Sequence, residues 1–243
     1  MVTRSYRKLQ LADCYTNIDV LYYYTDEAMI AMGHISSSQM TSAILGLVEE
    51  TNIAMLHSGV ALTLTVTAVG GISFESATDT DEALDALHDS DWIGDDRMEF
   101  EADLVQVIGV FDEDVCGRGD LYTGDDMDVF SIVMPACFEN YSHVHEFGHN
   151  FGCWHNRDSI DPDDHTDYSH GHRYCEGTDP YRTVMSYPCD DPNGWVPRMN
   201  FFSNPDYVYE GKYTGTPDED NARTIEDNMV SIANFRGPAV YEC

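Results

Sequence analysis

Short apolar runs in the first part of the chain have the length and spacing of strands. Residues 18–24, IDVLYYY, are almost entirely apolar and predict a buried strand. In residues 62–68, leucine, valine and alanine alternate with threonine, which predicts a half-buried strand with a threonine face. Residues 104–110 and 130–134 are two further apolar runs and predict two more strands.

Apolar residues at helical spacing predict helices between and after these strands. The serines at 36–38 are suitable N-caps, and the apolar positions that follow them are Met40, Ile44, Leu47, Val48 and Ala54. Residues 81–88 and 141–151 predict two shorter helices. The last predicted helix ends before Gly237-Pro238 and carries on one face Ala222, Ile225, Met229 and Ile232.

Residues 152 to about 217 differ from the rest, because Gly, Pro, Asp and Tyr are frequent there and hydrophobic periodicity is weak. We therefore expect irregular structure in this segment. The whole pattern predicts one α+β domain over residues 14–243. Its upper subdomain would span about 14–152, and its smaller, loop-rich lower subdomain with the C-terminal helix about 153–243.

The helix predicted just before the loop-rich segment carries the motif HEFGHNFGCWH at residues 145–155. His145 and His149 are four residues apart, so they lie on one face of a helix and can point at one metal ion. His155 can join them only if the helix stops, since six more helical residues would carry it ~9 Å along the axis. Gly152 lies where the chain must bend, because glycine accepts a left-handed C-cap.

Three histidines with a fourth position open are typical of a catalytic zinc site, since structural zinc sites usually have four protein ligands. Glu146 can reach a water molecule on such an ion, take its proton as general base and deliver it to the leaving amine. A bare H-E-x-x-H also arises by chance on surface helices, but the extended pattern is far rarer. We therefore expect one catalytic Zn2+ and hydrolysis of peptide bonds.

This motif, followed by TVMSY at residues 183–187, resembles the metzincins, zinc metalloproteases with a methionine turn. Within them the chain is most similar to the reprolysin-like group and to the bacterial peptidyl-Asp metalloendopeptidases. The similarity extends over residues 17–237 through the segments IDVLYYYTDEA, ETNIAMLHSGV, EADLVQVIGV, RTVMSYPC, NFFSNPDYVYEG and DNARTI.

The resemblance implies a zincin fold with a twisted, mostly parallel five-stranded sheet, one antiparallel edge strand and two long helices. Substrate would extend along the edge strand, for which residues 130–134 are the expected segment. Met185 would pack beneath the zinc histidines as a floor, and Tyr187 would bind zinc or the tetrahedral intermediate. From the residues alone, Met185 is a gap-filling core residue and Tyr187 a tyrosine packed in the turn. Asn156 departs from the family, in which an acidic residue usually follows the third histidine.

The resemblance also implies cleavage on the amino side of aspartate. An acidic side chain just after the scissile bond needs a cation in the pocket that receives it. Arg173 and Arg182, which lie between His155 and Met185, are the candidates. The alternative for each is a surface arginine that offsets the local acidity.

Seven cysteines without a C-x-x-C pair favour disulfides and an extracellular compartment over a thiolate metal site. Pairing does not follow from sequence alone. The expected pairs, of which the last is the weakest, are Cys116–Cys137, Cys175–Cys189 and Cys14–Cys243. Cys153 would then be a buried free cysteine or a thiol near the zinc. The first 15 residues lack a signal-peptide core, so we expect a signal segment outside this chain.

Two further groups of polar residues suggest metal sites, but each has a simpler interpretation. His165, His170 and His172 form a loose cluster among aspartates, for which a solvated loop is favoured over a second metal. Structural Ca2+ is possible but unsupported, because the acidic residues of this segment fit no EF-hand spacing. These residues, which we interpret as surface charge, are Asp161, Asp163, Asp164 and Asp167.

The charge is strongly negative, with 44 acidic against 12 basic residues and a formal net charge of -32. Such a surface repels the phosphates of nucleic acids and anionic lipid heads, so both are excluded as partners. No stretch reaches the ~20 apolar residues of a membrane span. Adaptation to a salty medium and an ordinary acidic secreted protein both fit this composition.

Two functions stay open at this point. The favoured one is a secreted zinc endopeptidase, whose partners are protein or peptide substrates. The alternative is a catalytically weak, metzincin-like module that binds zinc or another molecule without turnover, although the presence of Glu146 favours the enzyme. The chain has no G-x-S-x-G motif and no phosphate-binding loop, so serine hydrolase and nucleotide-dependent functions have no support. The sequence does not define the oligomeric state.

Overall fold

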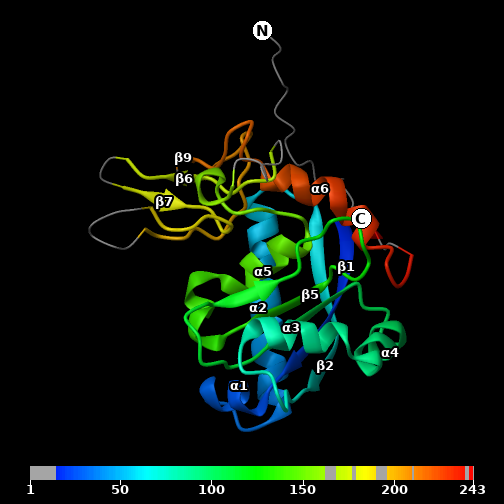
Figure 1. Cartoon of the computed structure of the whole chain (residues 1–243). Coiled ribbons are helices and arrows are strands. Elements are labelled where there is room, and N and C mark those ends of the chain that lie inside the picture. Colours follow the sequence, from blue (N-terminus) through cyan, green and yellow to red (C-terminus); the bar gives the residue numbers. More distant parts are fainter. Residues whose placement is uncertain are drawn as a thin grey trace.

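A mostly parallel sheet lies at the centre of the computed structural model, which describes residues 15–161, 168–176, 179–189, 196–209, 211–238 and 241–242 (Figure 1). In spatial order its strands are β2 (Leu62–Gly71), β1 (Tyr15–Tyr24), β3 (Leu104–Ile108), β5 (Phe130–Val133) and β4 (Gly117–Gly119). The first four run parallel, and β4 pairs antiparallel with β5. The short β10 (Tyr241–Glu242) pairs antiparallel with the start of β1. The expected α+β class and five-stranded sheet are confirmed.

The antiparallel edge strand is β4, and the expectation that residues 130–134 form this edge is wrong. β5 is buried throughout and pairs with β3 on one side and β4 on the other. A fully apolar run is typical of such an interior parallel strand. β4 is short, contains two glycines and is at most half-buried, so it has no hydrophobic pattern that would reveal it in the sequence.

The longest described helix, α2 (Ser37–His57), begins after Ser36, whose side chain accepts a hydrogen bond from the Gln39 amide. It packs against β2 and α5 (Ser142–Asn150). The other described helices are α1 (Asp26–Ala31), α3 (Thr80–His88), α4 (Asp91–Glu99), η1 (Pro135–Asn140), η2 (Arg157–Ser159) and α6 (Asn221–Ile232). None of the described helices is long and apolar enough to cross a membrane.

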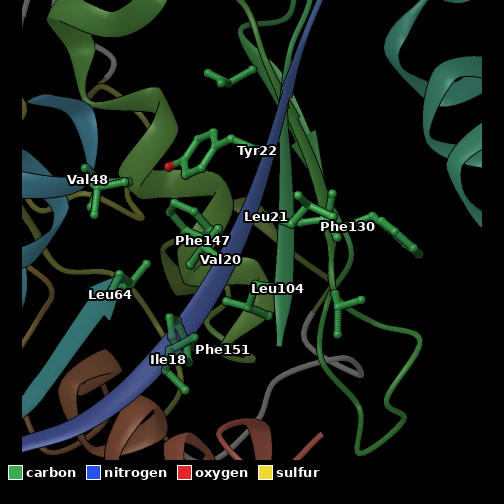
Figure 2. Close-up of a cluster of buried hydrophobic side chains, with 14 of the residues drawn as sticks. Ile18, Val20, Leu21, Tyr22, Val48, Leu64, Leu104, Phe130, Phe147 and Phe151 are labelled. Atoms are coloured by element: carbon green, nitrogen blue, oxygen red, sulfur yellow. The ribbon is translucent and has the colours of Figure 1, made fainter. Parts of the chain in front are cut away.

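Alternate residues of β1 point to opposite sides of the sheet and contribute to a core on each side. Ile18, Val20 and Tyr22 are fully buried and lie toward α5 (Figure 2). Phe147 of α5 meets Tyr22 edge-to-face, with the ring centroids 6.3 Å apart. Burial of one large apolar side chain contributes roughly 1.5–3 kcal/mol, so these contacts hold α5 against the sheet.

Buried hydrogen bonds fix the position of α5 along the sheet. Gln106 of β3 donates from Nε2 to the His143 carbonyl at 3.1 Å. Near the other end of the helix, Asn150 Nδ2 donates to the carbonyls of Phe130, at 3.0 Å, and Asp120, at 3.1 Å. A buried polar group without its partner costs roughly 1–3 kcal/mol, so these bonds disfavour sliding or rotation of α5.

The segment after α5 is less irregular than expected, because it contains two small hairpins. β6 (Arg173–Tyr174) pairs with β7 (Tyr181–Arg182), and β8 (Val208–Tyr209) pairs with β9 (Lys212–Tyr213). Figure 1 shows these strands to one side of the main sheet. Helix α6 follows them and packs against β1.

Two disulfides link segments within the described part of the chain. Cys116–Cys137 joins the residue before β4 to η1, with Cα atoms 5.5 Å apart. Cys175–Cys189 spans β7 and the methionine turn, with Cα atoms 5.6 Å apart. Both are the main pairings expected from the sequence, whereas Cys14–Cys243 lies outside the described residues. Cys153 is free and buried. The two disulfides are compatible with an extracellular protein.

Candidate metal centre

Helix α5 and the turn after it bring the three histidines of the motif together. The helix ends at Asn150, and Gly152 has a φ of 87°, which is the left-handed conformation that favours glycine. A Cβ at Gly152 would lie 2.9 Å from Asn228 Nδ2, so a larger residue would be crowded there as well. The predicted bend at Gly152 is confirmed, and it returns the chain so that His155 reaches the helix.

The three imidazoles converge through their Nε2 atoms. The Nε2 atom of His155 lies 3.1 Å from that of His145 and 3.1 Å from that of His149. Among the described residues, these three histidines are the one group of potential metal ligands whose donor atoms all lie within 4.8 Å of one another. The sequence motif therefore corresponds to a cluster that can hold one metal ion.

Backbone carbonyls orient two of these rings and define their tautomers. His145 Nδ1 lies 2.9 Å from the Val184 carbonyl, and His149 Nδ1 lies 2.9 Å from the Cys153 carbonyl. A carbonyl oxygen only accepts hydrogen bonds, so in the neutral rings the proton is on Nδ1 and Nε2 carries a lone pair. The Nε2 atoms of His145 and His149 are therefore available to bind a cation. The donor set thus fits a metal ion, and the carbonyls play the orienting role usual for metal-bound histidine.

Burial keeps the three rings neutral near neutral pH. Loss of solvation lowers the pKa of His149 to about 4 and that of His155 to about 3. The pKa of His145 lies well below 6.5 for the same reason. Histidine must be neutral to bind a metal, so the cluster is in its ligand form across the physiological range.

Glu146 is buried beside the cluster, and two glycines of the edge strand leave room for it. A Cβ at Gly117 would lie 2.9 Å from Glu146 Oε1 and 2.5 Å from the Ile132 carbonyl. A Cβ at Gly119 would lie 2.8 Å from the Glu146 carbonyl. Burial raises the pKa of the Glu146 carboxyl to about 8, while Arg198 and Arg118 oppose this shift. A carboxylate with a raised pKa is a stronger base than one in water.

Met185 packs beneath α5 and belongs to the turn that orients His145. Gly148 has no side chain, and a Cβ there would collide with the Met185 sulfur. Met185 is fully buried, and the carbonyl of its neighbour Val184 is the partner of His145 Nδ1. The part of Met185 as a floor beneath the zinc histidines stays a prediction.

Tyr187 lies beside the histidine cluster, in contact with His155. Its ring centroid is 4.2 Å from that of His155, and the residue is 43% exposed. The Tyr187 amide donates to Asn156 Oδ1 at 2.8 Å. Burial and the Glu146 charge raise the pKa of the phenol, so it keeps its proton and can donate a hydrogen bond. The side-chain oxygen of Asn156 thus holds the turn, at the position where metzincins usually have an acidic residue.

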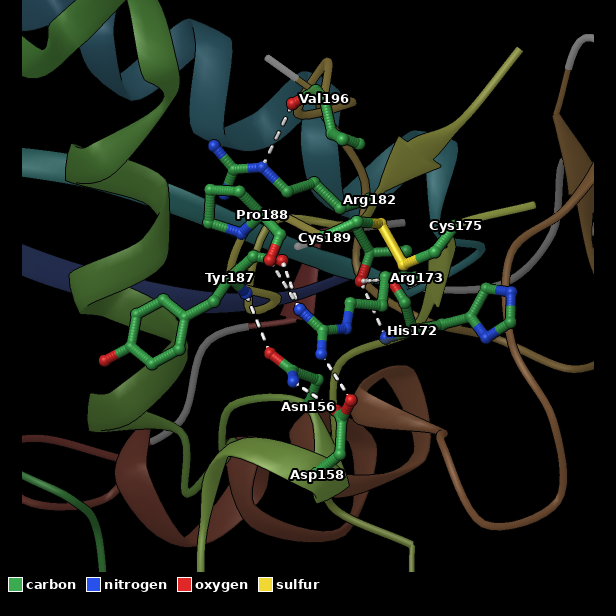
Figure 3. Close-up of a disulfide and its surroundings, with 11 residues drawn as sticks. Asn156, Asp158, His172, Arg173, Cys175, Arg182, Tyr187, Pro188, Cys189 and Val196 are labelled. Atoms are coloured by element: carbon green, nitrogen blue, oxygen red, sulfur yellow. Dashed lines mark hydrogen bonds and ion pairs between the residues drawn. A yellow bond between two sulfur atoms is a disulfide. The ribbon is translucent and has the colours of Figure 1, made fainter. Parts of the chain in front are cut away.

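Arg173 and Arg182 are both engaged with other groups of the chain (Figure 3). The Arg173 guanidinium pairs with Asp158 and donates to the Pro188 carbonyl. Arg182 is buried and donates to the Ser186 carbonyl at 2.6 Å and, from Nε, to the Val196 carbonyl at 3.2 Å. Both arginines therefore brace the segments around the methionine turn.

Arg198 is a cation near the cluster that the sequence did not single out. Its charge acts on Glu146 and Tyr187, as well as on the three histidines. It lies in the segment after the methionine turn, within no motif and no periodic element. No signal in a single sequence separates such an arginine from one on the surface.

Within the described part of the chain, the other candidate ligands lie outside the cluster. His170 is fully buried, and its Nδ1 lies 3.1 Å from the His155 carbonyl, so the expectation of a solvated loop is wrong for this residue. His172 pairs with Glu219 at 2.8 Å. Asp161 is described and exposed. The remaining residues of the two proposed groups lie outside the described residues: Asp163, Asp164, His165 and Asp167.

No protein-family model matches the chain, but it is similar to three curated bacterial proteins named peptidyl-Asp metalloendopeptidase. The protein of Xanthomonas campestris pv. campestris is 30% identical over 232 residues. Those of Stenotrophomonas maltophilia strains R551-3 and K279a are 30% and 29% identical over 233 residues. Each match covers 90% of this chain and 52% of the relative, so the chain spans about half the length of these relatives.

A solved structure described as "Structure of a chaperone-substrate complex" contains a chain of similar fold, with a TM-score of 0.72 and 21% sequence identity. The match covers 91% of this chain and 35% of that chain. At this identity the likeness concerns the fold alone. The similarity to proteins named metalloendopeptidases agrees with a candidate metal centre of three histidines and an adjacent buried glutamate.

Proposed function

We propose that this chain is a zinc-dependent endopeptidase of the metzincin, reprolysin-like type. The observation that carries the proposal is the convergence of the Nε2 atoms of His145, His149 and His155 next to the buried Glu146. Three imidazole nitrogens suit Zn2+, and a site with three protein ligands leaves a position for water or substrate. The names of the bacterial relatives support the same activity.

Each residue of the site has a defined part in this proposal. The three histidines would hold a zinc ion, which would supply the Lewis acidity needed to polarise the scissile carbonyl and to acidify a water molecule. Glu146 accepts the proton of that water and then delivers it to the leaving amine. Tyr187 donates a hydrogen bond from its hydroxyl to the oxyanion that develops. Met185 keeps His145 and α5 in place from below.

The edge strand β4 is the proposed docking site for an extended substrate. It is the terminal strand of the described sheet, and both of its glycines contact the segment of α5 that contains Glu146. Substrate added as a further strand would gain main-chain hydrogen bonds. This arrangement would bring the scissile bond beside the general base.

The wider setting is part of the proposal as well. We propose one catalytic domain over residues 14–243, with the division near Gly152, and protein or peptide substrates. Cleavage on the amino side of aspartate is proposed from the names of the relatives. An extracellular location is proposed from the two disulfides.

A binding module that holds zinc without turnover is the second candidate, because a three-histidine cluster alone does not require catalysis. The presence of Glu146 favours the enzyme over the binding module. Burial of a carboxylate beside the cluster destabilises the fold, and zinc binding alone does not require it. Digestion of casein by the zinc-loaded protein, its loss on treatment with a zinc chelator and its recovery on addition of Zn2+ are the results expected of the enzyme. Intact casein with stoichiometric zinc would instead identify a binding module.

A further inference from the structure

An endopeptidase that selects an acidic residue needs a positive charge near the reacting groups. The chain has only 12 basic residues against 44 acidic ones, and its overall field opposes an acidic substrate. The attraction must therefore be local, from a cation close to Glu146 and Tyr187. Two arginines act electrostatically on both of these residues, namely Arg118 and Arg198.

The backbone places Arg198 between the methionine turn and the start of α5. The Met199 amide donates a hydrogen bond to the Arg182 carbonyl at 2.8 Å, and the Arg182 amide donates to the Pro197 carbonyl at 3.0 Å. Arg198 Nη1 donates to the carbonyl of Asn140, the last residue of η1, at 2.9 Å. The guanidinium is thus anchored at one corner, beside the helix that carries Glu146.

The remaining hydrogen-bonding capacity of Arg198 is largely unused. Its Nε is buried without a hydrogen-bond partner, and no carboxylate of the described residues forms an ion pair with it. Burial and the neighbouring Arg182 lower the pKa of the Arg198 guanidinium to about 9, so it is still charged at neutral pH. The Arg198 guanidinium is partly buried, and its lack of an ion pair with a described carboxylate is unfavourable. A bound carboxylate would remove that cost.

The rival cations already have partners. Arg118 forms a two-pronged ion pair with Asp81, with contacts of 2.7 and 2.9 Å. Arg173 is paired with Asp158. Arg182 donates to two carbonyls, those of Val196 and Ser186. A substrate carboxylate would have to displace an existing partner at each of these arginines, but not at Arg198.

We propose that Arg198 is the specificity-determining residue that binds the carboxylate of an acidic side chain immediately after the scissile bond. The inference rests on the proposed endopeptidase function and replaces Arg173 and Arg182 as the candidates for this pocket. The guanidinium fork provides two parallel hydrogen bonds to a carboxylate. A neutral side chain of the same shape would leave the buried charge unpaired and would be disfavoured.

The test uses zinc-loaded protein at 0.15 M salt and three peptides that differ only in the residue after the scissile bond, which is Asp, Asn or Leu. The ratio of kcat/KM for Asp over Asn is the readout. We expect wild type to favour Asp by about 10-fold or more, and Arg198→Gln to lower this ratio at least about 10-fold. Arg223→Gln, which removes the same charge from exposed α6, and Arg173→Gln should leave the ratio unchanged.

Each other outcome overturns a defined part of the account. An unchanged ratio in Arg198→Gln, or an equal loss of kcat/KM for all three peptides, contradicts the inference. If Arg173→Gln instead loses the preference for Asp over Asn, Arg173 is the residue that binds the acidic side chain. Wild type that cleaves the peptides without preferring Asp removes the inference and leaves the endopeptidase intact, whereas wild type that cleaves nothing removes the proposed function. If Arg198→Gln does not fold, as judged by zinc content, Arg198→Lys must still lower the ratio several-fold, because it loses the fork but keeps the charge.

Discussion

The proposed metal binding depends on three imidazole nitrogens, and backbone carbonyls orient two of the three rings. His149 is fixed by the Cys153 carbonyl and faces His155. We expect His149→Ala to lose the bound zinc, because two imidazoles bind the ion far more weakly than three. His34→Ala, which removes a histidine outside the cluster, is the control and should retain one zinc per chain. Stoichiometric zinc in purified His149→Ala would show that the ligand set is wrong.

The pH dependence of hydrolysis follows from the same residues. Glu146 must be ionised to act as a base, and burial raises its pKa to about 8. A cation at the histidines favours the carboxylate and lowers this value again, so activity should fall as the pH drops below about 6. The pKa values of His149 and His155, about 4 and about 3, place metal loss at lower pH. Zinc content and kcat/KM measured on the same samples check this order, and full activity at pH 4 with zinc bound would contradict it.

The residues of the centre were predictable to different degrees. The spacing of the three histidines brings them together only if a helix is followed by a bend, so their clustering could be predicted from the sequence alone. The bend at Gly152 could be predicted because glycine is the residue that tolerates a left-handed conformation. Arg198 and the Val184 carbonyl that orients His145 have no local signature, because each acts through a contact between segments distant in sequence.

The narrow fit between β4 and α5 makes the edge strand sensitive to one added methyl group. We expect Gly117→Ala to displace Ile132 or Glu146, to destabilise the fold by roughly 1–3 kcal/mol and to lower kcat at least about 10-fold. Gly71→Ala, at the end of β2 where nothing lies within 4 Å of an added Cβ, is the matched control. Urea unfolding and peptide hydrolysis of both variants test this, and a Gly117→Ala enzyme with wild-type kcat would show that the glycine is not needed for Glu146.

Elements with a strong hydrophobic pattern were predicted well, and those without one were missed. The buried strands β1, β3 and β5 and the long helix α2 follow directly from apolar runs and helical spacing. β4 and the small hairpins form by pairing with other segments, and their own residues have no pattern that predicts this pairing. The assignment of the edge to residues 130–134 failed because an apolar strand needs neighbours on both sides.

The net charge of -32 affects the stability of the whole molecule. Repulsion among so many carboxylates favours expansion, and salt screens it, with a Debye length of ~10 Å at 0.1 M and ~3 Å at 1 M. We expect the urea midpoint of unfolding to rise between 0.1 and 1 M NaCl. A large rise, with partial unfolding at low salt, would favour adaptation to a saline medium over an ordinary acidic secreted protein. A midpoint that falls with salt would contradict the repulsion argument.

The central claim is that Glu146 and the three histidines have separate roles, one as a base and the others as ligands. The most direct measurement compares zinc content and peptide hydrolysis in wild type and Glu146→Gln. The amide keeps the shape of the side chain but cannot accept the proton of water. We therefore predict one zinc per chain in both proteins and a loss of kcat/KM of at least ~10²-fold in the variant. Hydrolysis by zinc-loaded Glu146→Gln at the wild-type rate would contradict the account.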